Sequence, residues 1–450
     1  MINMENFKII NGNNLDVLDT LEEKSIDAII TDPPYELGFM GKKWDASGIA
    51  YNVSLWEKAL KVLKPGGHLL AFGGSRTFHR VACAIEDAGF EIRDTIMYLY
   101  GSGFPKSQNI GLAIDKKIGV ESKVVGTGKS GSSSRAYQSE EMTTAGCYEI
   151  KEAQNEWRGW GTCLKPAFEP IIVARKPFKG TLVENVLKNR VGAINIDECR
   201  VPLEEGYKAP IRSEASQNYA LERKGLTQCD MGKKTDYAGA NVDGRFPANV
   251  IHDGSEEVIK DMPNSNGAGG SVPNVKVKGY GNGIGTGESV YTPNDRTGFN
   301  SGSGSVSRYF YCAKASSKDR NEGLEEFEDK TKVFNGQSGE SSKEIKDVEK
   351  RFTTVCKNIH PTVKPTSLMQ YLVRLVCPKG ATILDIFNGS GSTGKAVAYE
   401  NVERNANYKY IGIEPNKEYC DISEARIKYV LNKKQDDKDS YVQLNLLGEE

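Results

Sequence analysis

The sequence predicts an α/β fold, in which a mainly parallel sheet carries helices on both faces and a large irregular insert interrupts the chain. Two observations support this. Short apolar runs alternate with amphipathic segments at both ends of the chain, a pattern typical of parallel sheets covered by helices. The middle of the chain, by contrast, shows weak periodicity and long stretches rich in Gly and Ser, which cannot build a core of their own.

The N-terminal part supplies three predicted strands and two helices. The run SIDAII ends at Asp32-Pro33-Pro34-Tyr35, where two prolines cannot donate ladder hydrogen bonds and stop the strand. The next helix is expected to end at the Pro65-Gly66-Gly67 turn. The amphipathic segment further on places Val81, Ala84, Ile85 and Ala88 on one face. In order, the expected elements are strand 25–30, helix 56–63, strand 68–72, helix 76–88 and strand 91–100.

The middle of the chain is predicted to be mostly loop, with one returning strand. FEPIIVA is an apolar run that stops before Pro177. The expected segments are a loop at 122–147, a strand at 168–174, a loose α+β region at 179–262, a Gly-rich loop at 264–307 and a polar surface helix or linker at 320–350.

Regular periodicity returns near His360. A helix is expected after Thr366, and a final helix is expected to end near Val430 and leave a polar tail. Between them we expect a strand at 381–387, a Gly-rich turn, a helix at 395–400 and a strand at 408–414. The chain therefore divides into 1–117, an insert at 118–350, 351–432 and a tail at 433–450.

Composition excludes several classes of protein. The 450 residues carry a formal net charge of -1, so any nucleic acid must be held by a local groove rather than by bulk charge. The nine cysteines contain no CxxC pair, which argues against zinc or redox sites and fits a reducing cytoplasm. We expect no metal, no signal peptide and no membrane span, and hence a cytoplasmic protein.

The first chemical motif is a Gly-rich turn between a strand and a helix, GSGSTG at 389–394. Its glycines (Gly389, Gly391 and Gly394) permit a tight turn and close approach of a ligand, together with Ser392 and Thr393. Glu414 ends the next strand, where an acid accepts hydrogen bonds from ribose hydroxyls. Asp385 and Phe387 favour a cationic amine, such as the methionine end of S-adenosylmethionine, over a pyrophosphate.

The second motif is Asp32-Pro33-Pro34-Tyr35. An exocyclic amino group of a nucleic-acid base is a poor nucleophile, because its lone pair is delocalised into the ring. A carboxylate and a backbone carbonyl that accept its two hydrogens push the nitrogen toward tetrahedral geometry, and two prolines stiffen that turn. Tyr35 offers a face on which an extruded base can stack.

DPPY near the N-terminus and FxGxG near the C-terminus resemble the S-adenosylmethionine-dependent amino-methyltransferases of DNA. The order of the motifs resembles the beta class, so the resemblance implies a circularly permuted Rossmann-like methyltransferase sheet whose insert recognises the target. The segment HPTVKP matches a motif of that class that closes over the methionine moiety, which implies cofactor-binding roles for His360, Thr362 and Lys364. The wider pattern resembles the phage- and mobile-element-encoded branch, in segments 41–45, 63–107, 161–174, 244–252 and 309–315.

The resemblance implies methyl transfer to adenine N6 in double-stranded DNA by base flipping, with Asp32, Pro33, Pro34 and Tyr35 as the catalytic residues. Asp in the first motif position favours adenine, and cytosine N4 is the alternative. Relatives are often dimers, so a homodimer is a candidate assembly. Whether a cognate restriction enzyme exists stays open. Relatives often carry Asp where this chain has Asn13, which puts that contact in doubt.

Other classes of protein explain less of the sequence. A nicotinamide-dependent oxidoreductase accounts for the Gly-rich turn and Glu414 but leaves DPPY and the insert unused. A nucleotide triphosphatase lacks an acid-ended strand for magnesium in the expected register. An inactive DNA-binding protein does not fit intact motifs, and an RNA methyltransferase is disfavoured by the size of the insert.

Overall fold

The structure is a computed structural model that describes residues 4–37, 46–103, 107–129, 147–203, 244–266, 303–313, 318–334 and 352–446. The chain forms two compact units. The larger combines residues 1–101, 168–330 and 355–450, and the smaller combines 102–167 and 331–354. Each is described by itself.

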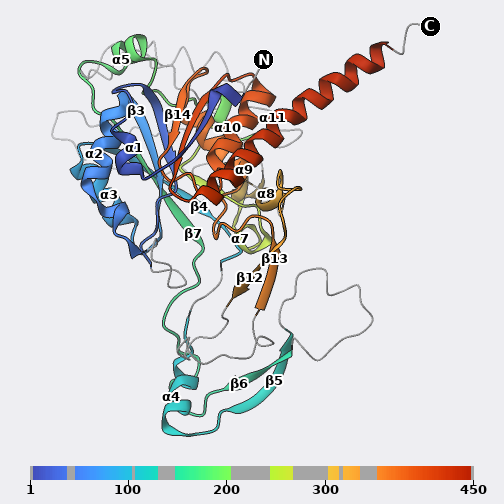
Figure 1. The fold of residues 1–450 in the computed structure, drawn as a ribbon. Coiled ribbons are helices and arrows are strands. Elements are labelled where there is room, and N and C mark those ends of the chain that lie inside the picture. The colour runs from blue at the N-terminus through green and yellow to red at the C-terminus, as the bar shows by residue number, and fades with distance from the viewer. Residues whose placement is uncertain are drawn as a thin grey trace, which may run out of the picture. The chain divides into compact units, whose positions relative to one another are not determined.

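The larger unit is built on a nine-stranded sheet of order β1-β15-β14-β2-β3-β7-β4-β8-β11 (Figure 1). All neighbouring pairs are parallel except those that β7 makes with β3 and β4. The strands are β1 Phe7–Asn11, β2 Ile26–Thr31, β3 Leu63–Phe72, β4 Glu91–Leu99, β7 Phe168–Arg175, β8 Val250–His252, β11 Tyr311–Cys312, β14 Thr382–Asp385 and β15 Lys409–Glu414.

This strand order brings polar residues from both ends of the chain to one edge of the sheet. The parallel strands all end there, at residues such as Thr31, Asp385 and Glu414. Because β7 runs the other way, it begins at that edge, with Glu169 opposite Tyr98. Ligands of open α/β sheets bind outside the carboxyl ends of the strands, so this edge is where a site is expected.

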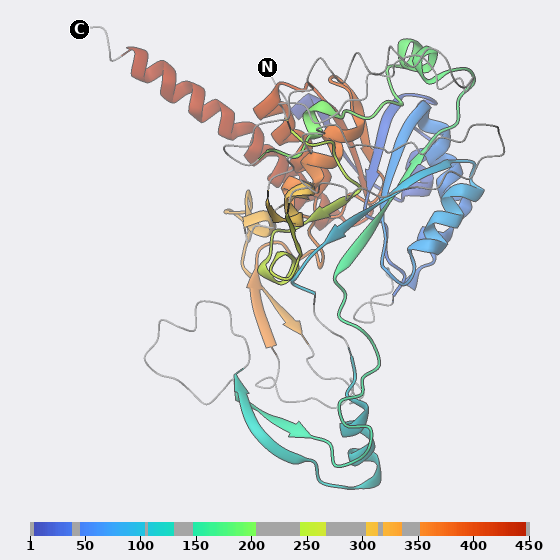
Figure 2. The same ribbon diagram turned by 180° about the vertical axis from the view of Figure 1, so that it is seen from behind.

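Helices cover both faces of the sheet, as predicted, and each face has its own core (Figures 1 and 2). On one face α1, α2 and α3 bury side chains such as Leu18, Trp56 and Ile85. On the other, α9, α10 and α11 bury Leu372, Val397 and Ile427. The helices of this unit are α1 Asn14–Leu18, α2 Val53–Val62, α3 Phe78–Asp87, α5 Leu182–Asn189, α7 Glu256–Ile259, α8 Lys318–Asn321, α9 Thr366–Val376, α10 Ser392–Arg404 and α11 Lys417–Leu446, with 3-10 turns η1 Met4–Asn6, η4 Ile49–Tyr51, η6 Asp197–Cys199 and η7 Val306–Tyr309.

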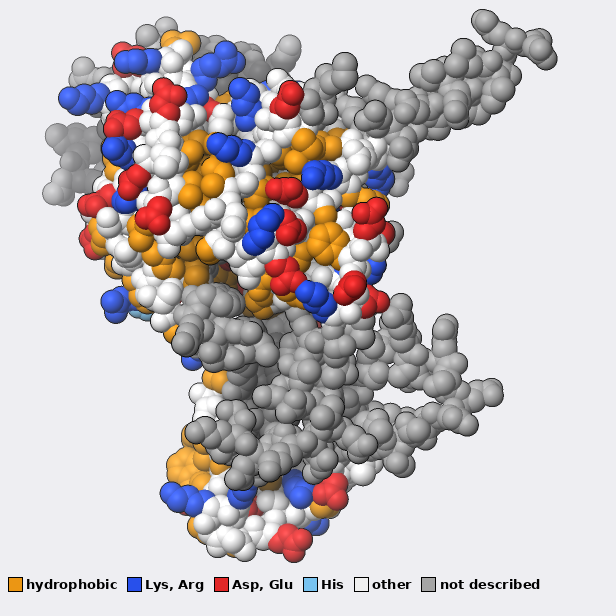
Figure 3. Space-filling model, in the orientation of Figure 1, with side chains coloured by type: hydrophobic (Ala, Val, Ile, Leu, Met, Phe, Trp, Pro, Cys, Tyr) orange, Lys and Arg blue, Asp and Glu red, His pale blue; other side chains and the backbone are white. Residues whose placement is uncertain are grey.

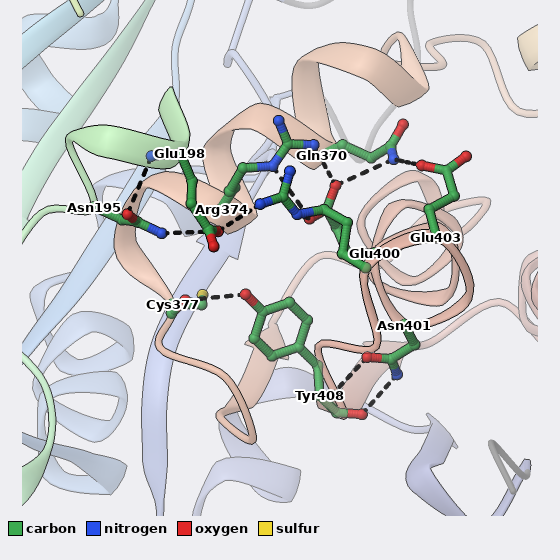
Figure 4. Close-up of polar contacts among 10 residues, drawn as sticks. Asn195, Glu198, Gln370, Arg374, Cys377, Glu400, Asn401, Glu403 and Tyr408 are labelled. Atoms are coloured by element: carbon green, nitrogen blue, oxygen red, sulfur yellow. Dashed lines mark hydrogen bonds and ion pairs between the residues drawn. The ribbon is translucent and has the colours of Figure 1, made fainter. Parts of the chain in front are cut away.

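A polar network joins η6 to α9 and α10 (Figure 4). Its centre is Glu400, whose side chain is 1% exposed and accepts from Arg374 Nη2 at 2.6 Å. Arg404 connects Glu400 to Glu198 of η6 at 2.7 Å. Because buried ions need partners, this network fixes η6, a segment of the predicted insert, onto α9 and α10.

Several elements differ from the sequence predictions. Pro65-Gly66-Gly67 lies inside β3 rather than in a turn, and a Cβ at position 67 would lie 2.8 Å from the Asp27 carbonyl oxygen. The final helix α11 runs to Leu446, so the predicted polar tail at 433–450 is helical through most of its length. The predicted insert at 118–350 contributes three strands to the central sheet: β7, which was predicted, lies inside the sheet, and β8 and β11, which were not, extend one end of it.

The smaller unit contains α4 Ile110–Ile118 and an antiparallel hairpin of β5 Lys123–Lys129 and β6 Cys147–Glu152. The predicted loop at 122–147 is therefore wrong at 123–129, and its residues 130–146 lie outside the described residues. Asp115 joins the helix to the following segment, because its carboxylate accepts from the Gln154 backbone and from Asn155 Nδ2. Two further two-stranded sheets pair β9 Asn264–Asn266 with β10 Ser303–Ser305 in the larger unit, and β12 Lys330–Phe334 with β13 Phe352–Cys356 mostly in the smaller unit.

The Gly-rich segment predicted at 264–307 lies mostly outside the described residues. Among the described helices, none is both long enough and apolar enough to cross a bilayer.

Candidate active site

Asp32-Pro33-Pro34-Tyr35 follows directly after β2, as predicted. Every residue of β2 is buried, so the motif starts at a fixed point of the sheet edge. Asp32 Oδ2 lies 3.0 Å from Lys364 Nζ. Asp32 Oδ1 is buried and has no hydrogen-bond donor within the part of the chain that the structure describes. The motif thus presents one engaged and one available carboxylate oxygen.

Lys364, predicted to bind the cofactor, lies beside two carboxylates at the sheet edge, those of Asp32 and Glu169, and forms a cluster with them. Its ammonium also contacts Glu169 Oε2 at 3.1 Å and donates to the Tyr35 hydroxyl at 2.9 Å. The same nitrogen lies over the rings of Tyr35 and Phe72. Burial lowers the pKa of Lys364, but the Asp32 and Glu169 carboxylates outweigh it and raise that pKa above its usual value. The side chain therefore stays a buried cation.

Glu169 is the member of this cluster that the sequence analysis missed. It is the second residue of β7, and it reaches the site because β7 is antiparallel to both of its neighbours. A parallel strand would have placed its first residues at the opposite edge. The only local signal was an acid in an otherwise apolar run, FEPIIVA, since charged residues are rarely buried unless they are paired.

The phenol of Tyr35 is held inside the cluster. Burial raises its pKa well above the usual value, and the nearby Asp32 and Glu169 carboxylates raise it further. Thr77 donates to the Tyr35 carbonyl at 2.8 Å and anchors the end of the motif. Because its pKa is raised, Tyr35 stays neutral at ordinary pH.

Two more tyrosines lie at the end of β4, and of these Tyr98 is buried and Tyr100 half-buried.

Asp385 turns both oxygens toward groups of the protein itself. Oδ1 accepts from Thr31 Oγ1 at 2.7 Å and from the Phe387 backbone, and Oδ2 accepts from Thr393 Oγ1 at 2.6 Å. Burial raises the pKa of Asp385 to about 6, against these hydrogen bonds. The carboxylate thus ties β2, the Gly-rich turn and α10 together.

The three glycines of the turn are required by the protein's own packing. Gly389 and Gly391 have φ of 51° and 75°, which favours glycine. A Cβ at position 389 would lie 2.8 Å from His360 Nε2, and one at position 391 would lie 2.1 Å from Ser423 Oγ. Gly394 packs in the same way against the ring of Tyr410. The turn is therefore pressed between the HPTVKP segment and α11.

Glu414 lies at the end of β15, as predicted, and its carboxylate braces the turn. Oε2 accepts from the Gly389 backbone at 2.9 Å and Oε1 from the Asn416 backbone at 2.9 Å. Burial raises its pKa. Each oxygen keeps a further lone pair, so these contacts leave acceptors for ribose hydroxyls.

The HPTVKP segment covers the turn and is itself fastened by α8. His360 Nδ1 pairs with the Thr362 carbonyl, and its ring meets Tyr419 edge-on. Arg320 donates to the His360 carbonyl at 2.8 Å. This differs from the predicted surface helix or linker at 320–350, because the start of that region is built into the site.

Asp319 extends the fastening on both sides. Its side chain accepts from Thr366 at the start of α9, and its backbone carbonyl accepts from the buried Arg426 at 2.7 Å. Arg426 also holds Ser390 of the turn. The HPTVKP segment and the Gly-rich turn are thus held by α8, which no sequence motif marks.

The remaining predicted positions are placed as follows. Asn13 caps α1, accepting from the Leu15 backbone at 2.9 Å, so its amide serves the helix. Phe387 and Ser392 are partly exposed at the turn. The segments 41–45 and 104–106 lie outside the described residues. No group of three or more His, Cys, Asp or Glu able to hold a metal occurs in the described ranges.

Three neighbouring strands of a Rossmann-like sheet carry these features: the DPPY motif follows β2, the Gly-rich turn follows β14, and an acid ends β15. Together they define the class of methyltransferases that use a nucleoside cofactor. The family model described as DNA methylase, for N6 and N4 methyltransferases, matches residues 26–198 and 275–425. The chain belongs to this family, whose cofactor is S-adenosylmethionine.

The individual relatives share only part of their sequence with this chain. The chain is 24% identical over 231 residues to Type II methyltransferase M.HindIII of Haemophilus influenzae, covering 42% of this chain and 64% of that protein. It is 37% identical over 81 residues to Orphan methyltransferase M.BamHII of Bacillus amyloliquefaciens, covering 18% and 28%. The chain thus matches less than two thirds of these relatives' lengths. Among solved structures, the cytosine-N4-specific PvuII DNA methyltransferase overlaps with a TM-score of 0.38 at 13% identity, covering 95% and 94%.

Proposed function

We propose that this protein transfers a methyl group from S-adenosylmethionine to adenine N6 in double-stranded DNA. The observation that carries the proposal is the carboxylate of Asp32, which stands at the sheet edge with one buried oxygen lacking a donor among the described residues. An acceptor in that state suits the N–H of an exocyclic amino group, because a buried acceptor gains most from a hydrogen bond.

The DPPY motif would act on an extruded base. Asp32 and the Pro33 carbonyl would each accept one amino hydrogen, and Pro34 would keep the turn stiff. Tyr35 would present its ring to the base. S-adenosylmethionine supplies the methyl group on a sulfonium, a leaving group that is already activated. The work of the protein is then to position the nitrogen, and Asp32 is placed to take the proton that the nitrogen loses.

The C-terminal motifs would hold the cofactor. We assign the adenosine end to Glu414 and the turn (Phe387, Gly389, Gly391, Ser392, Thr393 and Gly394), and the closing segment to His360 and Thr362. Asp385 would act by holding the turn through Thr31 and Thr393 rather than by touching the cofactor. Lys364 would serve the catalytic carboxylate. The insert would contact DNA, and we propose a cytoplasmic location.

The test is nucleoside mass spectrometry. The purified protein is incubated with unmethylated duplex DNA of mixed sequence and S-adenosylmethionine labelled in its methyl group, and the DNA is digested. We expect label on N6-methyladenine. Label on N4-methylcytosine would keep the family and the mechanism and replace the base. An absence of label in DNA, with cofactor binding intact, would overturn the proposed substrate.

A variant pair tests the role of Asp32. Asp32→Ala is expected to lower methyl transfer by about 10²–10⁴-fold, the usual contribution of a positioned acid or base. Calorimetry is expected to show nearly unchanged binding of S-adenosylmethionine. Asp32→Asn keeps the size and one acceptor oxygen and is expected to retain more activity than the Ala variant. Lost cofactor binding in Asp32→Ala would instead place Asp32 at the methionine end.

A further inference from the structure

Asp32 already has a cationic partner, which the DPPY motif alone does not reveal. Its Oδ2 atom is engaged by the ammonium of Lys364 at 3.0 Å. A charge-assisted contact of this kind is stronger than the bond a neutral amino group can offer. The Oδ1 atom stays open to an incoming amino group, but an ammonium held on Oδ2 weakens the whole carboxylate as an acceptor. Methyl transfer is therefore favoured when Lys364 releases Asp32, at least in part.

Release is costly unless the ammonium keeps a carboxylate. Lys364 is buried, its side chain 9% exposed, and an uncompensated buried charge costs several kcal/mol. Glu169 supplies the second carboxylate, 3.1 Å from the same nitrogen. The Tyr35 hydroxyl and the ring of Phe72 complete a set of contacts that does not depend on Asp32.

We propose that Glu169 is a positioning residue that retains the Lys364 ammonium while Asp32 changes partner from Lys364 to the amino group of the target base. The inference rests on the proposed function and adds a fourth participant to it. Glu169 does not touch the base in this scheme. It acts through Lys364, by lowering the free-energy cost of the change of partner at Asp32.

The backbone settings of the two residues fit these roles. Glu169 lies within β7, which is hydrogen-bonded on both sides, to β3 and to β4. Its position is therefore fixed by the sheet. Lys364 lies two residues before α9 on the HPTVKP segment, and its side chain has four rotatable carbons. A fixed acceptor and a long side chain allow the nitrogen to shift while one ion pair is kept.

The test is a double-mutant cycle on methyl transfer to DNA with Glu169→Gln, Lys364→Met and the double variant. Glu169→Gln leaves Asp32 as the sole carboxylate of the ammonium, so Lys364 should hold Asp32. We expect activity to fall about ten- to a hundredfold, the loss of one charge-assisted contact in the transition state. Cofactor affinity and thermal unfolding should stay near wild type.

The double variant separates positioning from a merely structural role. Removing Lys364 frees Asp32, so Glu169→Gln/Lys364→Met is expected to be more active than Glu169→Gln alone, by at least about fivefold. Glu169→Asp, which keeps the charge, should recover part of the activity. A double variant no more active than the single one, or a Glu169→Gln enzyme equal to wild type, would refute the inference. Wild-type protein that does not methylate DNA would instead refute the proposed function beneath it.

Discussion

At the scale of single residues, the sheet edge concentrates ionisable groups that differ in their partners. Asp32 and Glu169 share one ammonium, whereas Asp385 is satisfied by hydroxyls and a backbone N–H. Burial makes a carboxylate harder to ionise, and it raises the pKa of Asp385. The two ion-paired carboxylates are suited to accept hydrogens, and Asp385 is suited to hold structure.

The raised pKa of Asp385 makes a prediction about stability and pH. Burial raises this pKa to about 6 from an unfolded value near 3.8, so between these pH values the folded state binds more protons than the unfolded state. Stability contributed by this group is present below about pH 4 and is lost as pH rises through about 6. The loss amounts to about 3 kcal/mol for a two-unit shift.

Asp385→Asn removes that titration while keeping an acceptor for Thr31. Relative to wild type, the variant is therefore expected to gain up to about 3 kcal/mol of unfolding free energy between pH 4 and pH 8. Urea unfolding of both proteins across this range measures the difference. A difference that does not change with pH would mean that Asp385 titrates in the folded protein as it does in the unfolded chain.

At the scale of elements, the site depends on segments that carry no motif. The reversed direction of β7 brings Glu169 to the edge. The short helix α8 fastens HPTVKP and the Gly-rich turn, through Arg320 and the backbone of Asp319. These elements lie in the region that the sequence marked as an insert, so part of that region serves the site directly.

The network between α9 and α10 offers a test with a matched control on one helix (Figure 4). Glu400→Gln leaves the guanidinium of Arg374 without its carboxylate at a buried position. We expect a loss of about 3 kcal/mol in unfolding free energy, as for a broken buried ion pair. Glu403→Gln, one turn further along α10, changes an exposed contact to Gln370 and should cost less than about 0.5 kcal/mol. Equal losses in the two variants would show that burial does not decide the cost.

At the scale of the whole molecule, the larger unit is assembled from both ends of the chain. β15 lies between β1 and β14, and β14 lies between β15 and β2. The strands that carry Asp385 and Glu414 are thus neighbours of N-terminal strands. Positive and negative side chains are interspersed on the visible face of the molecule (Figure 3), in agreement with a formal net charge of -1.

This interleaving predicts that neither half of the chain is active alone. Fragments 1–223 and 224–450, expressed separately, should each fail to bind S-adenosylmethionine, because β14 then lacks β2 and β15 lacks β1. Co-expressed, they should copurify through a tag on one fragment and recover cofactor binding, measured by calorimetry. Cofactor binding by the isolated C-terminal fragment would contradict the prediction.

Prediction from sequence succeeded where local signals are strong. Strands β2, β14 and β15 are short apolar runs bounded by prolines, glycines or acids, and α3 shows a clear apolar face. It failed where tertiary contacts override local signals. Pro65-Gly66-Gly67 lies in a strand, where the Gly66 N–H donates to the Lys176 carbonyl and the Lys176 N–H donates to the Gly67 carbonyl. Lys364 was assigned by its motif to the cofactor, and the structure adds its contacts with Asp32 and Tyr35, which lie more than 300 residues away in sequence.

The sequence by itself determined the family, the order of its two motifs and the residues of DPPY and the Gly-rich turn, because these depend on residue type and spacing over short distances. Only the tertiary structure decided which groups face Asp32. Glu169 and Lys364 meet there because one strand runs against its neighbours and a C-terminal loop returns to an N-terminal strand. Neither fact is encoded in a local pattern, since pairing between distant segments depends on how the whole sheet buries its two faces.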